Sequence, residues 1–350
     1  MGLWNLMMHI EKLWQKANSL RGCLTKLKQE SSRRRYANDE DPLVMHDGFV
    51  SDEAKILSSK TFRALRSKTQ VFTFPQNTMI RTRQAHVHEV VACSVVCADM
   101  LGLNVNLVRA AACGHDIGHV PFSHQGEAWM ARAMGKPGFC HEVMGVVVAQ
   151  SIERSGRGLN LNWHTLDAMM RHSGNTARDG MSQEAWVLRH TDKFAYIFHD
   201  VNDIGLRMRY PISGELLSLT NGFGEDQRQR TSTAIAGLVI ESAECGKVCF
   251  EHSELGQKFT RLRTMMYEIY PRVTQQNVES IMGPVLECLK MLNLCDPFLL
   301  LALMTDEDAA RLAKEPMKDM QAFNRTAVSE IVPYLSQIGP VDLCAPDLDW

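Results

Sequence analysis

Hydrophobic residues along most of the chain recur every three or four positions, and the strict alternation typical of strands is scarce. One such stripe near the start consists of Leu3, Leu6, Met7, Ile10, Leu13, Trp14 and Ala17. Towards the end, the spacing predicts helices over residues 231–244, 251–269, 274–292 and 317–336, with Pro271, Pro284 and Pro316 at ends or kinks. The pattern therefore predicts an all-α protein.

Two breaks interrupt these periodic segments. Residues 31–42 are polar and include three consecutive arginines, and residues 210–230 carry Pro211 and three glycines. We therefore predict an N-terminal helix and linker over residues 1–42 and a catalytic core over 43–210. Residues 211–350 are expected to form a C-terminal helical region that completes the fold.

Composition narrows the class of protein but names no ligand. Of the 350 residues, 45% are hydrophobic and 22% charged, and the formal net charge is -2, as in an ordinary soluble globular protein. No stretch is long and apolar enough to span a bilayer, so no membrane partner is expected. Ten cysteines without a secretory signal indicate reduced thiols in a cytoplasmic protein. The N-terminal helix is expected to pack on the body or on a second subunit, and we expect a homo-oligomer.

The stretch with the most chemical information is GHDIGHVPFSHQGE, residues 114–127. Three histidines and two carboxylates crowd into it, and a buried core disfavours that density because each such group needs a partner to offset its desolvation. Metal ligation and acid–base catalysis both supply partners. The side chains concerned are His115, Asp116, His119, His124 and Glu127.

The spacing of this stretch requires a shaped turn. His115 and His119 lie four apart, so a continuing helix would place them on one face. The neighbouring Asp116 reaches the same point only if the turn is shaped locally, which Gly114 and Gly118 permit.

Two other segments carry chemical groups on helical patterns. RTRQAHVHEV, residues 81–90, offers two arginines and two histidines at the start of an apolar helix. TDKFAYIFHD, residues 191–200, aligns Asp192, Tyr196 and His199 on one helical face, with Asp200 beside them. Taken singly, such residues are more often structural than catalytic. Their joint pattern favours a site.

The order His86, then His115-Asp116, then Asp192 resembles the H…HD…D pattern of the HD-domain phosphohydrolases. The segments FRALRSKTQVF, RTRQAH, GHDIGHVPFSHQGE, GFCHE, RHSG and DKFAY are similar to the dGTPase-type deoxynucleoside triphosphate (dNTP) triphosphohydrolases, in that family's order. The resemblance implies an HD-domain helical bundle with additional C-terminal helices. It also implies that His86, His115, Asp116 and Asp192 hold a divalent metal ion. Two imidazoles and two carboxylates suit Mn, Mg, Fe, Co, Ni or Zn, so the ligands alone do not select the metal.

The resemblance further implies hydrolysis of dNTPs, with dGTP as the default substrate, to a deoxynucleoside and inorganic triphosphate. His124 and Glu127 match the family's catalytic pair, with His124 the general acid towards the leaving 5′ oxygen. Ser123 would cap a helix that begins at His124, and Glu127 would keep His124 able to carry a proton. The family histidines that line the phosphates correspond to His119 and His141.

Two further groups match positions that contact the substrate in the family. Those expected to face phosphate oxygens are Arg83, Lys68 and Lys193. Those expected to hold the deoxyribose near its 3′ hydroxyl are Gln70, Tyr196 and Asp200. The residues around His86 depart from the family pattern, so whether His88 joins the site is left open.

Alternatives remain at this stage. Another HD-type phosphohydrolase, such as a 5′-nucleotidase or a cyclic-nucleotide or alarmone phosphodiesterase, would share the ligands but has no need of the GHVPFSH and KTQV elements. A regulatory scaffold with a structural metal would bind single-stranded nucleic acid through Arg33, Arg34 and Arg35. The sequence leaves open whether a nucleotide effector activates the protein.

Overall fold

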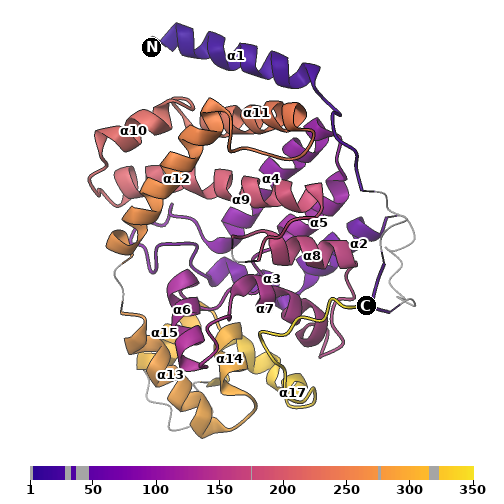
Figure 1. Cartoon of the computed structure of the whole chain (residues 1–350). Coiled ribbons are helices and arrows are strands. Elements are labelled where there is room, and N and C mark those ends of the chain that lie inside the picture. Colours follow the sequence, from indigo (N-terminus) through magenta and orange to yellow (C-terminus); the bar gives the residue numbers. More distant parts are fainter. Residues whose placement is uncertain (1–2, 28–32, 37–46, 175, 275–276, 315–322) are drawn as a thin grey trace.

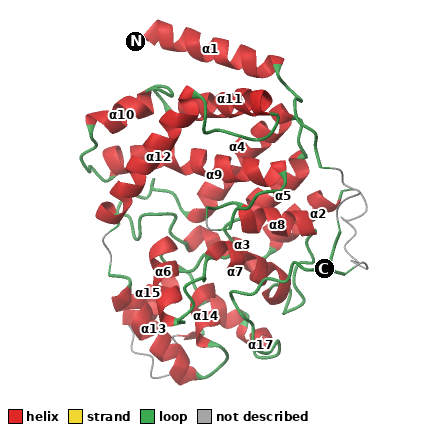
Figure 2. Ribbon diagram, viewed as in Figure 1, coloured by secondary structure: helices red, strands yellow, loops and turns green. Residues whose placement is uncertain are grey.

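The computed structural model describes residues 3–27, 33–36, 47–174, 176–274, 277–314 and 323–350. In these ranges the regular structure is helical, and the only β-type pairings are two isolated bridges, Arg34 with Asn162 and Thr69 with Thr82. Figure 2 shows the same composition, with helices in red joined by loops in green. The predicted all-α class is confirmed.

The helices fall into an N-terminal half that carries the histidine- and aspartate-rich motifs and a C-terminal half that flanks it on two sides (Figure 1). The first half contains α1 (Leu3–Ser19), α2 (Gly48–Ser58), α3 (Lys60–Ala64), α4 (Arg83–Leu101), α5 (Val105–Gly114), α6 (Ser123–Ala133), α7 (His141–Val147), α8 (Trp163–Arg171) and α9 (Gln183–Asn202). The second contains α10 (Gly214–Asn221), α11 (Gln227–Cys245), α12 (Glu254–Val273), α13 (Glu279–Leu292), α14 (Pro297–Leu303), α15 (Asp306–Lys314) and α17 (Val332–Leu335).

The two helices that position the site, α4 and α9, begin at residues whose hydroxyl groups cap them. The side chain of Thr82 accepts from the backbone N–H of Ala85 at the start of α4, and Ser182 does the same for α9. Helix α4 ends at Gly102, which has a left-handed backbone with φ of 79°. Helices α4 and α9 pack against each other and against α5 in the middle of the molecule.

Two hydrophobic clusters flank this central group. One includes Phe194, Phe198 and Phe259, whose rings meet between α9 and α12. The other joins the residues around Ile117 to the C-terminal helices α13, α14 and α15. Both clusters contain residues from either side of position 210. The segments before and after the predicted boundary therefore pack into the same hydrophobic clusters. The division into three parts stays a prediction.

The N-terminal helix packs on the body, as expected. Ala17 is buried, and Leu13 and Trp14 lie against the same cluster as α11. Figure 1 shows α1 along the outer side of α11. Much of the predicted linker, residues 28–32 and 37–42, lies outside the described residues. None of the described helices combines the length and apolar character that crossing a bilayer requires.

Two of the predicted helix ranges differ from the structure. The prediction of one helix over residues 317–336 is wrong: residues 317–322 lie outside the described part, and the remainder holds only a 3₁₀ turn, Ala327–Glu330, and α17. Pro333 cannot donate a helical hydrogen bond, and the hydroxyl of Thr326 binds the carbonyl of Phe323 instead. Helix α13 begins at Glu279, later than expected.

Candidate metal centre and catalytic site

The HD turn begins where α5 stops. Helix α5 ends at Gly114, and His115 to Gly118 form a turn rather than a further helical segment. A Cβ on Gly114 would lie 2.7 Å from the Met169 sulfur, and one on Gly118 would overlap the backbone oxygen of His141. The close approach of the His141 and Gly145 backbones therefore requires Gly118, whereas the neighbours of Gly114 are the ends of the flexible Met169 and Ile56 side chains.

The turn aims two imidazoles at one carboxylate. His115 Nε2 and His119 Nε2 each lie 3.4 Å from Oδ1 of Asp116. Both histidines and Asp116 are buried. The geometry expected from a continuing helix is thus reached by a shaped turn.

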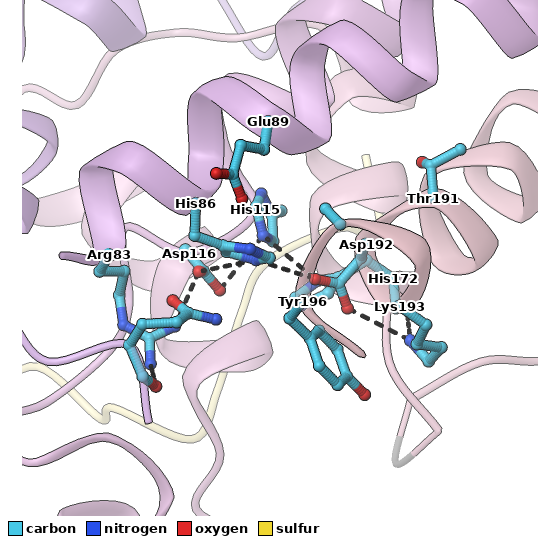
Figure 3. A network of polar contacts seen from close by, with 12 residues as sticks. Arg83, His86, Glu89, His115, Asp116, His172, Thr191, Asp192, Lys193 and Tyr196 are labelled. Carbon is cyan, nitrogen blue, oxygen red and sulfur yellow. Dashed lines mark hydrogen bonds and ion pairs between the residues drawn. The ribbon is translucent and has the colours of Figure 1, made fainter. Parts of the chain in front are cut away.

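Helices α4 and α9 bring the other two predicted ligands to the same point (Figure 3). His86, in the first turn of α4, places Nε2 3.0 Å from Oδ1 of Asp192 on α9 and 3.9 Å from Oδ2 of Asp116. His115 Nε2 lies 3.8 Å from the same Asp192 oxygen. Four side chains from three separate segments therefore converge.

The donor set fits a divalent cation. His115 Nδ1 hydrogen-bonds the backbone oxygen of Ala112 at 2.7 Å, which orients the ring and leaves Nε2 facing the carboxylates. That Nε2 is buried and has no hydrogen-bond partner in the described part of the chain. A buried imidazole nitrogen in this state is costly unless something binds it. Nitrogen and carboxylate donors of this kind could hold several divalent metals, and the geometry does not choose among them.

The charges of the cluster keep the two carboxylates and His86 in the protonation states that bind a metal, whereas the pKa of His115 is raised because Asp116 and Asp192 outweigh its burial. Burial alone would raise the pKa values of Asp116 and Asp192, but neighbouring cations lower both well below the usual range. For Asp116 these cations are chiefly His115 and Arg83, and for Asp192 the cation is chiefly Lys193, helped by the hydrogen bond with His86. Both carboxylates are therefore ionised. Burial lowers the pKa of His86, which leaves that imidazole neutral.

A row of histidines extends from the cluster towards solvent. The rings of His119 and His141 are stacked with centroids 3.7 Å apart. His124 lies at the outer end, 5.2 Å from the His119 ring, and its side chain is 70% exposed. Desolvation on its protein-facing side, together with the charges of His141 and Arg83, lowers the pKa of His124, although Glu127 opposes the shift.

Glu127 is closer to His141 than to His124. Its carboxylate lies 2.7 Å from Nδ1 of His141 and accepts the backbone N–H of the same residue at 3.0 Å, whereas Nδ1 of His124 is 4.0 Å away. Burial opposes ionisation of this pair, but Glu142 and Glu127 raise the pKa of His141 to about 9. His141 in turn lowers the pKa of Glu127 to about 2. The pair is therefore a buried ion pair.

Ser123 does not cap α6, so that prediction is wrong. Phe122 and Ser123 have φ of 64° and 55°, and no side chain caps the helix. The Ser123 hydroxyl instead donates to the Gln70 carbonyl at 2.7 Å and accepts from Nη2 of Arg83 at 2.9 Å. The left-handed turn directs the serine inwards, where it joins the loop that carries Gln70 to the HD segment.

Arg83 and Lys68 donate hydrogen bonds to other groups of the chain. Arg83 donates from Nη1 to Oδ2 of Asp116 at 2.7 Å and from its other nitrogens to backbone oxygens of Thr69 and Gln70. Lys68 donates to the backbone oxygens of His119 and Ala302. Burial lowers the pKa of Lys68 to about 7. In this structure both cations support the residues that line the site.

The predicted substrate residues of α9 lie in order along one face. Lys193 Nζ is 3.3 Å from Oδ2 of Asp192, and the Tyr196 ring lies 6.2 Å from that of His86. Asp200, two turns beyond Asp192, accepts from Arg81 at 2.7 Å and from Tyr270 at 2.8 Å. Burial raises its pKa to about 6 although Arg81 opposes the shift. Gln70 is buried, and its side-chain oxygen has no partner in the described part of the chain.

Comparison with known proteins finds a known domain in this chain and relatives that are similar to it over about two thirds of its length. The HD domain family model matches residues 83–197, which include all four predicted ligands. A deoxyguanosinetriphosphate triphosphohydrolase-like protein of Caldanaerobacter subterraneus subsp. tengcongensis is 34% identical over 244 residues, covering 69% of this chain and 70% of that protein. The chain belongs to this family of HD-domain proteins. A similarly named protein of Clostridium perfringens strain SM101 is 33% identical over 238 residues, 65% of this chain and 68% of that protein. Membership of the family supports a phosphohydrolase.

The structure places further residues in the candidate site to which the sequence gave no role. His172 places Nε2 3.2 Å from Nε2 of His141 and hydrogen-bonds the Met169 carbonyl through Nδ1. His172 belongs to the RHSG segment that resembles the family. The sequence could not show that the fold brings this histidine to the site. Asp306 had no sequence signal, because only the tertiary fold brings it near, and the sequence marks Arg81 only as one of the two arginines of RTRQAHVHEV. His88, left open by the sequence, is exposed and packs edge-on against Phe62.

Proposed function

We propose that the chain is a divalent-metal-dependent dNTP triphosphohydrolase that releases a deoxynucleoside and inorganic triphosphate, with dGTP as the default substrate. The observation that carries the proposal is the convergence of His86, His115, Asp116 and Asp192 beside the exposed imidazole of His124. The printed names of the relatives, deoxyguanosinetriphosphate triphosphohydrolase-like proteins, support this reaction class.

The four converging side chains would hold the ion. When bound there, a divalent cation polarises a phosphoryl oxygen and offsets charge on the triphosphate. Arg83 keeps Asp116 in position through their 2.7 Å contact, and Lys193 does the same for Asp192 at 3.3 Å. These contacts restrict the carboxylates to one arrangement.

His124 is the proposed general acid towards the 5′ oxygen of the leaving deoxynucleoside. Its exposed side chain is accessible to a substrate, unlike the buried His119 and His141 behind it. The cationic His141 places positive charge next to His124 and the phosphates, where anionic substrate would raise the pKa of His124 again. The ion pair with Glu127 holds His141 in that charged state.

The deoxyribose would lie over the α9 face beyond Asp192. Tyr196 supplies a flat ring beside His86, and the unpartnered side-chain oxygen of Gln70 can accept a sugar hydroxyl. Asp200 is buried and is held by Arg81 and Tyr270, so it would support this face from behind. We also propose action in the cytoplasm as a homo-oligomer, and a nucleotide effector remains a prediction.

Incubation of the pure protein and Mn²⁺ with each dNTP and each NTP, followed by identification of the phosphate product, tests the proposal. Inorganic triphosphate from deoxy substrates is the expected result. Orthophosphate, pyrophosphate or a preference for ribonucleotides would instead indicate another HD-type phosphohydrolase. If nothing is hydrolysed while single-stranded nucleic acid binds, the chain is a scaffold with a structural metal.

A further inference from the structure

A cluster of metal-binding side chains lies where α11 leads into α12, outside the candidate centre. Helix α11 ends at Cys245, and the next residue, Gly246, has a left-handed backbone with φ of 68°. The turn brings Cys249 back to Glu241, which lies one helical turn before Cys245. An oxygen of Glu241, the sulfur of Cys249 and a ring nitrogen of His252 all lie within 4.8 Å of one another.

Cys245 supplies a fourth donor to this cluster. Its thiol is within hydrogen-bonding distance of the thiol of Cys249. Cys245 and His252 are exposed whereas Cys249 and Glu241 are buried, so the cluster opens to solvent on one side. Two thiols, an imidazole and a carboxylate together match the donors of a tetrahedral zinc site. Thiolates also select such a cation over harder ions such as Mn²⁺ or Mg²⁺.

The spacing of the donors fits such an ion. Cys249 donates its thiol proton to Oε1 of Glu241, with 3.3 Å between sulfur and oxygen. With Zn–S and Zn–O bonds of about 2.3 Å and about 2.1 Å, two tetrahedral ligands lie roughly 3.6 Å apart. The ion would therefore take the place of the thiol proton after a small shift of the two side chains. Because His252 is exposed, its ring is free to turn towards the same point.

Backbone hydrogen bonds hold the carboxylate of Glu241 in place. Its Oε1 accepts the N–H groups of Glu251 and His252, and its Oε2 accepts that of Ser253. Such bonds orient a metal ligand before the ion arrives. Burial and the hydrogen bond to Glu241 raise the pKa of Cys249 to about 12, so the thiol keeps its proton until a cation displaces it.

We propose a second metal site that binds Zn²⁺ through four donors: Glu241, Cys245, Cys249 and His252. The site is structural, because four protein ligands leave no coordination position for a substrate. The ion joins the end of α11 to the start of α12. Helix α12 reaches the candidate centre through Tyr267, whose hydroxyl meets that of Tyr196 on α9 at 2.6 Å, so the ion also steadies this contact. The inference is independent of the proposed function, since none of its donors belongs to the candidate centre.

Titration of the full chain with Co²⁺, a spectroscopic substitute for Zn²⁺, tests the site in a buffer that keeps thiols reduced. A thiolate bound to Co²⁺ gives a strong sulfur-to-metal charge-transfer absorption in the near ultraviolet. The candidate centre offers only imidazoles and carboxylates, so Co²⁺ bound there gives no such absorption. The variants are Cys249→Ser and His252→Gln, of which the second changes an exposed side chain. Cys288→Ser is the matched control, because Cys288 on α13 is 7% exposed and Cys249 8%.

Wild-type protein and Cys288→Ser should show the absorption, and added Zn²⁺ should abolish it. Cys249→Ser and His252→Gln should each weaken Co²⁺ binding at this site by about 100-fold or more, because even the partners of metal ligands contribute about 10- to 100-fold. Asp192→Asn should keep the absorption, which separates this site from the candidate centre. No absorption from the wild-type protein at saturating Co²⁺ would overturn the inference, as would wild-type absorption and affinity in both variants. Failure of the dNTP assay with the absorption intact would overturn only the proposed function.

Discussion

Asp306 is a buried carboxylate at the start of α15 that holds two segments of the site together. Its Oδ1 accepts the backbone N–H of Phe122 at 3.1 Å, and its Oδ2 accepts that of Thr69 at 3.0 Å. The Thr69 carbonyl in turn accepts from Arg83 at 3.1 Å, and Phe122 precedes the inward-facing Ser123. Asp306→Asn keeps the shape of the side chain. One of the two backbone N–H groups then faces the amide donor of the asparagine and loses its acceptor.

The size of the effect follows from these contacts. A buried N–H that loses its acceptor lowers the free energy of unfolding by about 1–3 kcal/mol. A displacement of catalytic groups by about 1 Å can reduce turnover by about 100-fold, so we expect kcat of Asp306→Asn to fall by about 10- to 100-fold. Mn²⁺ binding should be retained, because Asp306 touches none of the proposed ligands.

Urea unfolding and initial rates of dGTP hydrolysis measure the two effects separately. Asp308→Asn is the matched control: it lies in the same helix, is equally buried, and its carboxylate accepts the N–H of Ala327 at 2.9 Å away from the HD turn. It should lose stability but keep its kcat. Equal kcat values for the two variants would show that Asp306 only stabilises the fold.

Three further substitutions give distinct outcomes. His124→Gln should reduce kcat by about 10³-fold and leave the Mn²⁺ affinity unchanged. Initial rates measure the first effect and calorimetry the second. A variant with wild-type activity would exclude His124 as the general acid. Glu241, whose carboxylate accepts the backbone N–H groups of Glu251, His252 and Ser253, has its pKa lowered to about 2 because these bonds outweigh burial. Since the unfolded value is 4.5, its stabilisation is present above pH 4.5 and is lost as the pH falls through 2. Glu241→Gln should therefore lower the free energy of unfolding by about 3 kcal/mol at pH 7 and flatten its decline in acid, whereas an unchanged acid profile would contradict this cause. Gly118→Ala, whose Cβ would overlap the His141 backbone oxygen, should lose about 3 kcal/mol or more in urea unfolding, and wild-type stability would mean that the turn can relax.

The residues of the candidate metal site stand out in the sequence because their chemical groups are unusual for their local surroundings. GHDIGH concentrates groups that a core disfavours, and Asp192 is a carboxylate on an apolar helix. Helical periodicity likewise predicted the all-α class. The all-α class follows from residue types and spacing alone, whereas the set of four ligands follows from the resemblance to the H…HD…D pattern.

The remaining features depend on contacts between distant segments. Nothing in the spacing of His124 and Glu127 shows that α7 brings His141 closer to the carboxylate. Similarly, the positive φ of Ser123 arises from its bonds to the loop of Gln70 and to Arg83, which override its usual capping preference.

Binding of a single divalent cation by His86, His115, Asp116 and Asp192 is the central claim, and a Mn²⁺ titration followed by calorimetry tests it most directly. Wild-type protein should bind Mn²⁺ with a stoichiometry of one per chain. The nearly isosteric Asp192→Asn should weaken that binding by about 100-fold or more while the protein stays folded. Wild-type affinity and stoichiometry in folded Asp192→Asn would contradict the claim.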